Sequence, residues 1–244
     1  MTDVAPAAEA APRTPRERAR ARTLKDIVRI GREQLALHGA AALSLRAVAR
    51  ELGVVSSAVY RYVENREELL TLLLVDAYNE LGDAVDAAVG ARPQDDFTGR
   101  FVALGVAVRG WALAQPSSYA LLFGSPVPGY QAPAERTTGP GTRVIGALAA
   151  ILDGAWRAGQ LSEAGPRGAA EAAPLAADLA KIRGEMGLAV PDPELARGVL
   201  VWTSLFGAIS FEVFGQYGKD TFAAREKLFA HHLAVLAGVA GLRP

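Results

Sequence analysis

The chain has 244 residues, of which 50% are hydrophobic and none is cysteine, so it can bury a sizeable core, while disulfides, thiolate metal sites and cysteine nucleophiles are excluded. Its 26 basic and 26 acidic residues cancel, but residues 11–66 hold 12 Lys and Arg against 5 Asp and Glu, which leaves 14 against 21 in the rest of the chain. A basic N-terminal segment followed by an acidic remainder is typical of a protein in which one domain contacts phosphate. A chance cluster of solvated charge would give the same pattern.

Residues 1–20 are expected to form a disordered basic leader, because the chain begins with a polar stretch rich in Ala and Pro. The sequence has neither a signal-peptide pattern nor a long apolar run free of charge, so we expect a cytoplasmic protein without a membrane partner. Arginines in and just after the leader would lie along a DNA backbone or in a minor groove. These arginines are Arg13, Arg16, Arg18, Arg20 and Arg22.

Residues 21–68 are expected to form a domain of helices, because apolar residues recur there at helical spacing. The first helix ends at Gly39, since glycine is a common helix stop. The elements that follow are short helices over 44–52 and 56–63, and a long helix from the capping residue Asn65 to about residue 88.

Residues 69–244 are expected to form a second helical domain, because the alternation of β-branched residues that is typical of strands is absent. The stretch 124–141 is rich in Gly and Pro and is expected to be a loop. The other expected helices cover residues 97–115, 117–123, 142–158, 169–185, 193–214 and 221–238. The predicted fold class is therefore all-α, with two domains.

The two short helices form a candidate helix-turn-helix for DNA. The second helix of such a pair fits the major groove, and small side chains at its start allow close approach to base edges. Exposed tyrosine hydroxyls suit phosphate contacts, unless the rings pack against the first helix instead. An arginine at the start of the long helix adds its charge to free backbone N–H groups that favour phosphate. The candidate DNA-contacting residues are Arg46, Val55, Ser56, Ser57, Ala58, Tyr60, Arg61, Tyr62 and Arg66.

The run from Leu52 to Leu69 resembles the signature of the TetR (tetracycline-repressor) family of transcriptional regulators. It carries a Gly-Val turn, a tyrosine with a second aromatic residue two positions later, and a basic residue before Glu-Leu. The resemblance covers residues 22–72 and implies a ligand-responsive repressor that binds a palindromic operator as a homodimer and is released by a small effector. In this sequence the implied phosphate contacts are Tyr60, Tyr62 and Arg66, and the implied base contacts are Arg46 and residues 55–58.

The sequence departs from the family pattern at two positions. Val55 stands where the family often has a capping Ser or Thr, so Ser56 is expected to cap the second short helix, which would then start one residue later. Arg66 stands where Lys is usual, which keeps the charge but changes the geometry of any phosphate contact.

The resemblance also implies that the C-terminal domain dimerises and binds an inducer. Apolar residues recur at alternating steps of four and three within 193–214, which is a heptad pattern, at Leu195, Val199, Trp202, Phe206, Ile209 and Val213. With the last helix, this pattern predicts a homodimer held by a four-helix bundle across a two-fold axis. The run Trp202-x-x-x-Phe206-Gly is similar to a Trp-x-x-x-His-Gly motif of one group of TetR C-terminal domains, with Phe206 in place of the histidine.

Large aromatic side chains beside Gly-rich helices suit an apolar cavity, so the expected effector is a small apolar or aromatic molecule. The candidate lining residues, for which ordinary core packing is the alternative, are Trp111, Tyr119, Phe123, Trp156, Trp202 and Phe206. The polar groups that would orient such a ligand are Arg109, Glu212, His231 and His232. Adjacent histidines point about 100° apart on a helix, so these two are expected at a surface, and no metal or cofactor is expected.

Two other classes of protein remain as alternatives. An enzyme is disfavoured because the three histidines are scattered and the sequence has no Gly-rich phosphate loop and no nucleophile beside a base, so no catalytic residue is proposed. A helical adaptor that has lost DNA binding is disfavoured by Arg46, Tyr60 and Arg66. Activation of transcription remains an alternative to repression.

Overall fold

The computed structural model describes residues 14–162 and 173–243. Every regular element in this part of the chain is a helix, apart from one isolated bridge between Leu161 and Leu242. The all-α prediction is therefore confirmed. The chain forms two compact units, the first made of the residues up to Glu80 together with Gln115–Gly141, and the second of Leu81–Ala114 together with the residues from Thr142 onward. This division differs from the expected boundary between residues 68 and 69.

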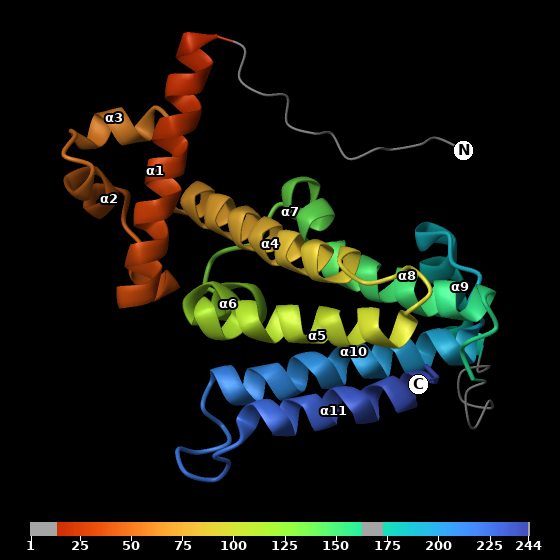
Figure 1. Cartoon of the computed structure of the whole chain (residues 1–244). Coiled ribbons are helices and arrows are strands. Elements are labelled where there is room, and N and C mark those ends of the chain that lie inside the picture. The colour runs from red at the N-terminus through yellow and green to blue at the C-terminus, as the bar shows by residue number, and fades with distance from the viewer. Residues whose placement is uncertain (1–13, 163–172, 244) are drawn as a thin grey trace. The chain divides into compact units, whose positions relative to one another are not determined.

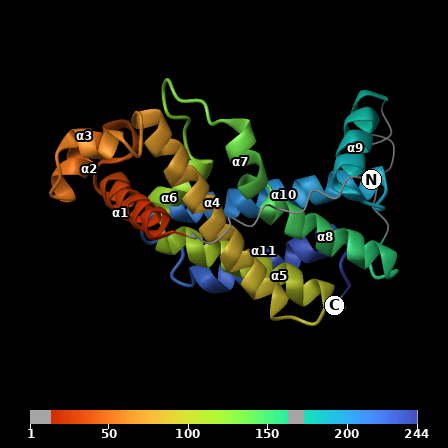
Figure 2. The ribbon, with the colours of Figure 1, turned by 90° about the horizontal axis from the view of Figure 1, so that it is seen from above.

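The first unit contains a helix-turn-helix and a second stretch of chain that packs with it. Its helices are α1 (Pro15–His38), the 3-10 helix η1 (Ala40–Ala42), α2 (Leu45–Glu51), α3 (Ser56–Tyr60), the start of α4 (Arg66–Gly90), α6 (Pro116–Phe123) and α7 (Ala134–Gly141). Both ribbon views place α2 and α3 on the same side of α1 (Figures 1 and 2). We call α1 to α3 with the N-terminal turns of α4 the reading head.

The helix α1 begins earlier than expected. Thr14 caps it through a reciprocal pair of hydrogen bonds, in which the amide of Glu17 donates to the Thr14 hydroxyl over 3.2 Å and the Thr14 amide donates to the Glu17 carboxylate over 2.9 Å. Residues 15–20, which were expected in a disordered leader, are therefore helical. Residues 1–13 of that leader, with Arg13, lie outside the described residues. The helix ends at Gly39 as predicted, with a φ of 74° that favours glycine.

The two short helices have different boundaries from those expected. Val55 occupies the N-cap position of α3 and Ser56 is already its first helical residue. The expectation that Ser56 caps this helix is therefore wrong. The regular helix ends at Tyr60, and the amides of Tyr62 and Val63 both donate to the carbonyl of Val59, which forms a turn instead of a continued helix.

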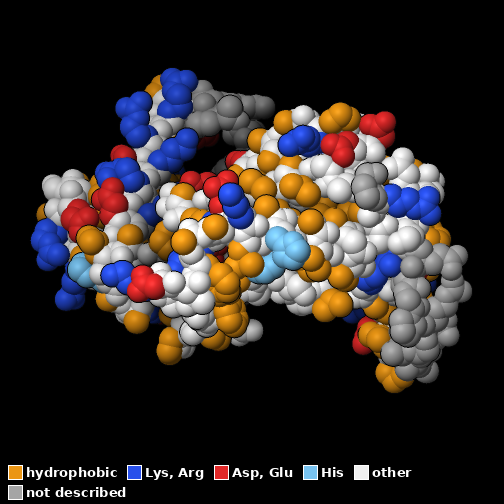
Figure 3. Space-filling view, turned by 60° about the horizontal axis from the view of Figure 1, so that its bottom comes forward, with side chains coloured by type: hydrophobic (Ala, Val, Ile, Leu, Met, Phe, Trp, Pro, Cys, Tyr) orange, Lys and Arg blue, Asp and Glu red, His pale blue; other side chains and the backbone are white. Residues whose placement is uncertain are grey.

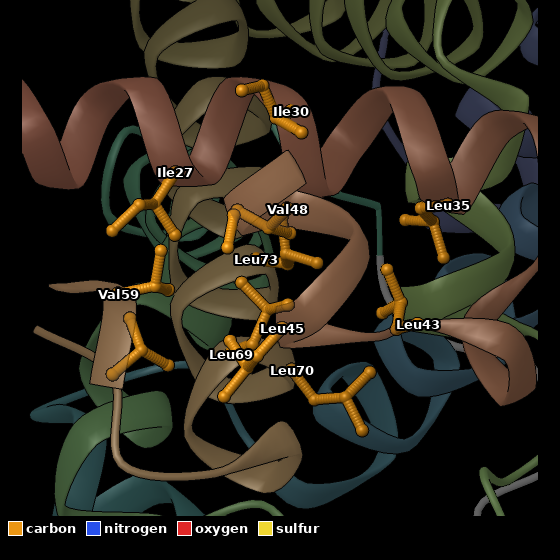
Figure 4. Packing of buried hydrophobic residues seen from close by; sticks show 12 residues of the cluster. Ile27, Ile30, Leu35, Leu43, Leu45, Val48, Val59, Leu69, Leu70 and Leu73 are labelled. Atoms are coloured by element: carbon orange, nitrogen blue, oxygen red, sulfur yellow. The ribbon is translucent and has the colours of Figure 1, made fainter. Parts of the chain in front are cut away.

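The core of the reading head is apolar and closely packed (Figure 4). Ile27 of α1, Val48 of α2 and Leu69 of α4 are fully buried, and Val59 of α3 is only 2% exposed. Burying each such side chain contributes about 2 kcal/mol. This core fixes which face of α3 points outward.

The stretch 124–141, which was expected to be a loop, ends in the helix α7. Gly and Pro predominate before Ala134, but Ala134-Glu-Arg-Thr-Thr forms helical turns and Pro140 lies near the end of the helix. The stretch is tied to α4 within the same unit: Arg136 donates to Glu68 over 2.6 Å, and the hydroxyls of Tyr130 and Thr71 lie 2.9 Å apart. These contacts hold residues 115–141 against the reading head.

The second unit is a bundle of helices. Its elements are the C-terminal turns of α4, α5 (Phe97–Ala114), α8 (Arg143–Arg157), α9 (Ala173–Met186), α10 (Asp192–Val213) and α11 (Arg225–Ala240). The helices α5, α10 and α11 lie side by side (Figure 1). At Gly105 of α5, a Cβ atom would lie 2.4 Å from the side chain of Leu233 of α11. Glycine at position 105 therefore permits the approach of these two helices.

Asp153 of α8 anchors the segment that leads into α10. Its carboxylate accepts from the amides of Ala189 and Val190 over 2.6 and 2.9 Å and from Arg157 over 2.6 Å. Burial alone would raise the pKa of Asp153. The hydrogen bonds from Arg157 and from the two amides lower the pKa by a larger amount together, so the net pKa is below the ordinary 3.8.

Replacing Asp153 with Ala should lower the free energy of unfolding by about 2 kcal/mol at pH 7, because the buried Val190 amide loses its acceptor. A carboxylate with a lowered pKa stabilises the folded state above its unfolded pKa, and this contribution is lost as the pH falls through the folded value. The stability difference between the two proteins, measured by urea denaturation, should therefore shrink below pH 3.8. A difference that stays constant down to pH 2 would contradict this role.

Candidate DNA interface and effector domain

The outward face of α3 is small, neutral and accessible. Because Val59 points into the core, Val55 and Tyr60 are left 71% and 45% exposed, and Ser57 is also exposed. The remaining α3 candidates differ in exposure, since Ser56 and Ala58 are half-buried and Arg61 is exposed. This face has the size and polarity for close approach to base edges in a major groove.

Arg46 lies in the first turn of α2, and its side chain is exposed. A guanidinium at this place can reach a base edge or a phosphate next to the groove that α3 would occupy. The position of Arg46 is therefore compatible with a contact to a base edge and with a contact to a phosphate.

Two of the expected phosphate contacts also make packing interactions. Tyr62 is half-buried against the core, and the guanidinium carbon of Arg20 lies 5.3 Å from the centroid of its ring. Arg66 donates through Nη2 to the carbonyl of Ala40 over 2.8 Å and to that of Ala41 over 3.4 Å. Arg66 thus holds η1 against the start of α4, which is a positioning role that the sequence did not reveal.

The N-terminus of α4 is capped as predicted, since the amide of Glu68 donates to Asn65 over 2.8 Å. The Glu68 side chain pairs with Arg136. The capping residue was readable from the sequence, whereas the distant arginine was not.

The aromatic candidates for an effector site are divided between the two units. Tyr119 and Phe123 belong to the first unit, where Tyr119 is fully buried and the two ring centroids are 5.1 Å apart. Trp202 and Phe206 lie one turn apart on α10, with ring centroids 4.2 Å apart and the ring planes tilted by 44°. The aromatic residue at position 206 thus packs on Trp202. The other two candidates in the second unit are Trp111, which is buried, and Trp156, which is half-buried.

Trp111 of α5 carries a buried polar atom that the rest of the described chain does not satisfy. The residue is 7% exposed, and its indole Nε1 has no hydrogen-bond partner among the described residues. Buried donors of this kind usually have a partner. The indole nitrogen is therefore a candidate for contact with a bound molecule.

Arg109 and Glu212, expected as polar groups for a ligand, pair with each other. Arg109 of α5 donates through Nε and Nη2 to both carboxylate oxygens of Glu212 on α10, each over 2.7 Å. These hydrogen bonds raise the pKa of Arg109 further above its ordinary value. Arg109 also lies over the ring of Phe229 at 5.4 Å. On α11, His231 is exposed and His232 is half-buried, and the described residues contain no group of three or more possible metal ligands.

The helix α10 packs in its own unit through a different stripe from the heptad expected. The buried residues are Glu194, Leu195, Gly198, Val201, Leu205, Ile209 and Glu212. This stripe shares Leu195 and Ile209 with the heptad, whereas Val199, Trp202, Phe206 and Val213 lie outside it. Apolar side chains remain exposed elsewhere on α10 and α11, at Val199, Leu200, Phe211, Val235 and Val239, and at Phe214 directly after α10. In Figure 3 the side that holds α11 is turned toward the viewer, and hydrophobic side chains are visible on it.

Among the described helices, α10 alone has the length and mean hydropathy, 1.2, of a membrane-crossing helix. This is weak evidence for a membrane span, because core helices share these properties.

A helix-turn-helix with an exposed second helix, carried by a helical second unit, defines a DNA-binding transcriptional regulator. Residues 27–73 match the family described as bacterial regulatory proteins, tetR family, and residues 101–236 match the tetracyclin repressor-like C-terminal domain. The chain therefore belongs to the TetR family, as its sequence indicated. The family model and the relatives that the chain matches are described as transcriptional regulators.

Regulators of the same kind occur in mycobacteria. The chain is 50% identical over 197 residues to the HTH-type transcriptional regulators Rv1816 of Mycobacterium tuberculosis and Mb1846 of Mycobacterium bovis, with 80% of this chain and 82% of each relative covered. The crystal structure of SCO4313 has a TM-score of 0.72 and 34% identity, covering 92% of this chain and all of that one. A Rhodococcus protein of 21% identity shares the fold with a TM-score of 0.67, over 91% of this chain and 95% of that one.

Proposed function

We propose that this regulator is a cytoplasmic repressor that binds a palindromic operator as a homodimer and is released by a small apolar or aromatic effector. The observation that carries the proposal is the outward face of α3, where Val55, Ser57 and Tyr60 are exposed beside the buried anchor Val59. In this proposal α3 lies in the major groove and Arg46 and residues 55–58 contact bases. Arg61, Tyr60, Tyr62 and Arg66 border the same surface.

The dimer would form through α10 and α11. Apolar side chains at an exposed helix surface favour a partner of the same chemistry, and a two-fold axis lets one face serve both subunits. Leu200 and Phe211 are 54% and 49% exposed, and Val235 of α11 is 49% exposed. A dimer would present two α3 helices to successive turns of one DNA face, which is what a palindromic operator requires.

The effector would bind in the second unit. The unsatisfied indole nitrogen of Trp111 offers one hydrogen bond to a ligand, and the adjacent rings of Trp202 and Phe206 offer apolar surface. The fold neighbour FadR from Bacillus subtilis, with a TM-score of 0.59 and 14% identity, is described in complex with stearoyl-CoA, which is a property of that protein. It illustrates that this fold can hold a ligand with a long apolar part.

Effector release would act as a population shift. A ligand that binds better when the two reading heads are separated lowers operator affinity by its differential affinity for the two states, typically about 1–3 kcal/mol. The long helix α4 is the proposed lever, because it contributes residues to both units. Arg136 and Tyr130 would transmit part of the change, since they contact the first turns of α4.

Two single substitutions on α3 separate base reading from phosphate binding. Ser57→Ala should change the base preference in duplexes selected from a random-sequence pool, because the hydroxyl can donate to or accept from base edges. Tyr60→Phe should weaken binding to all duplexes by about threefold to tenfold without changing that preference, because only a phosphate contact is lost. Both effects are measured by fluorescence anisotropy and by sequencing of the selected pools.

Matched controls lie outside the helix-turn-helix in the sequence. Ser125 is exposed in the segment after α6, and Tyr217 lies beyond the C-terminal end of α10. Ser125→Ala and Tyr217→Phe should leave affinity and base preference unchanged. If Ser57→Ala and Tyr60→Phe behave like these controls, α3 does not read the operator.

A further inference from the structure

The N-terminal end of α1 projects from the reading head as a basic helix. Residues 14–20 are exposed, and burial in the core starts only at Ile27. The ribbon in Figure 1 shows this end of α1 extending beyond α3. Between Pro15 and Arg22 the helix carries four arginines and one acid, Glu17. Figure 3 shows these basic side chains gathered at the upper left, along the free end of α1. At 1.5 Å per residue, this extension is about 12 Å long.

The extension is built to stay helical. Pro15 sits at the first helical position, where it has no amide to satisfy, and Thr14 and Glu17 satisfy each other's amides, while the acid of Glu17 meets the positive end of the helix dipole. Arginine and alanine, which make up most of the following residues, are strong helix formers. The arginines are therefore presented by a rod continuous with the packed part of α1.

The four arginines point to opposite sides of this rod. Arg16 and Arg20 are separated by four residues, and Ile27 follows seven residues later, so these three lie within about 40° of one another on the helix. Ile27 points toward Val59 of α3 (Figure 4), and Arg20 lies over the ring of Tyr62 just after α3. The face of Arg16 and Arg20 is thus the face on which α3 packs.

The other pair lies on the opposite face. Arg18 and Arg22 are about 180° away from Arg16 and Arg20, in line with Lys25 and Arg29. All four of these side chains are exposed, and Arg29 forms an ion pair with Glu33 over 2.7 Å. This stripe points away from α3.

We propose that Arg16 and Arg20 bind backbone phosphates of the duplex that flanks the segment read by α3, and that Arg18 and Arg22 do not. The side of α1 that carries Arg16 and Arg20 is the side on which α3 packs, and it continues beyond the end of α3. Duplex DNA lying on α3 would therefore extend toward these two arginines. Their positive charge complements the DNA backbone, whose phosphates supply most sequence-independent affinity. The ring of Tyr62 orients Arg20 for this contact. The inference rests on the proposed DNA reading by α3 and adds a second contact with no base preference.

The test uses two double variants with the same change in charge. A duplex selected by the wild-type protein from a random-sequence pool is prepared as the selected core and as the core extended by about ten base pairs at each end, one helical turn. The wild-type protein should bind the extended duplex about tenfold more tightly at low salt. R16Q/R20Q should abolish this gain and flatten the dependence of affinity on salt, whereas R18Q/R22Q should keep the gain within a factor of two.

The outcomes separate this inference from the proposed function. Glutamine keeps the helix propensity of arginine, and circular dichroism verifies that the helix content is unchanged. Equal losses from the two double variants would show long-range attraction only and overturn the inference, as would equal affinity of the wild-type protein for the two duplexes. If the wild-type protein selects no sequence from the pool, the proposed function itself fails.

Discussion

Replacing Arg109 with Met should lower the free energy of unfolding by about 3–5 kcal/mol, because it leaves the carboxylate of Glu212 buried without its partner. The Glu212 side chain is 7% exposed and that of Arg109 is 17% exposed, so water compensates little of the loss. Methionine fills a similar volume, and the cost therefore arises from the unpaired charge. Urea denaturation at one fixed protein concentration measures the difference.

Two further variants test the origin of this effect. The double variant R109M/E212L removes both charges and should recover most of the lost stability, because an apolar pair often replaces a buried ion pair without cost. Removing the exposed ion pair on α1 by Arg29→Ala should cost less than about 1 kcal/mol, since these side chains are 58% and 52% exposed. A double variant no more stable than R109M alone would show that shape, and not charge, is what the pair provides.

Placing charges on the exposed apolar surface of α10 should abolish operator binding. In L200E/F211E both substitutions lie at side chains about half exposed within one subunit, so the fold of the subunit is retained while a symmetric interface would bring like charges into an apolar contact. A monomer carries one reading head, and its affinity should fall by about a thousandfold, toward that of non-specific binding. Analytical ultracentrifugation measures the oligomeric state and fluorescence anisotropy the affinity.

The matched control is V106E. Val106 of α5 is 54% exposed, so the same apolar-to-acidic change is made outside the last two helices. V106E should remain a dimer with unchanged operator affinity. If L200E/F211E also stays dimeric, subunits associate through some other surface.

Local sequence signals predicted much of the reading head. Gly39 ends α1 because its positive φ suits glycine, and Asn65 caps α4 through its side-chain oxygen. Val59 and Val63 point inward at helical spacing, as expected. Each of these features depends on residues within a few positions of one another, which is the range over which sequence patterns are informative.

Features that depend on distant residues were not predictable in this way. Arg66 donates to carbonyls 25 and 26 residues away, and Arg136 pairs with Glu68 across 68 residues. The helix α10 is apolar on most sides, so its periodicity, which suggested a heptad seam for the dimer, could not show that Val201 and Leu205 face the core of its own unit. The early start of α1 depends on the Thr14–Glu17 capping pair, whose significance was obscured by the Ala- and Pro-rich residues before it.

The first unit is built from two separate stretches of the chain, and this constrains the design of chimeras between such regulators. The chain passes between the units after Glu80, after Ala114 and after Gly141, and Leu121, Val127 and Tyr130 from the later stretch cover the core of the reading head. A chimera joined by a single cut within α4 would combine this covering layer with a head from another parent, leaving mismatched apolar surfaces. Grafting a new sensor onto this head should therefore transfer residues 115–141 along with the first 80, as one inherited module.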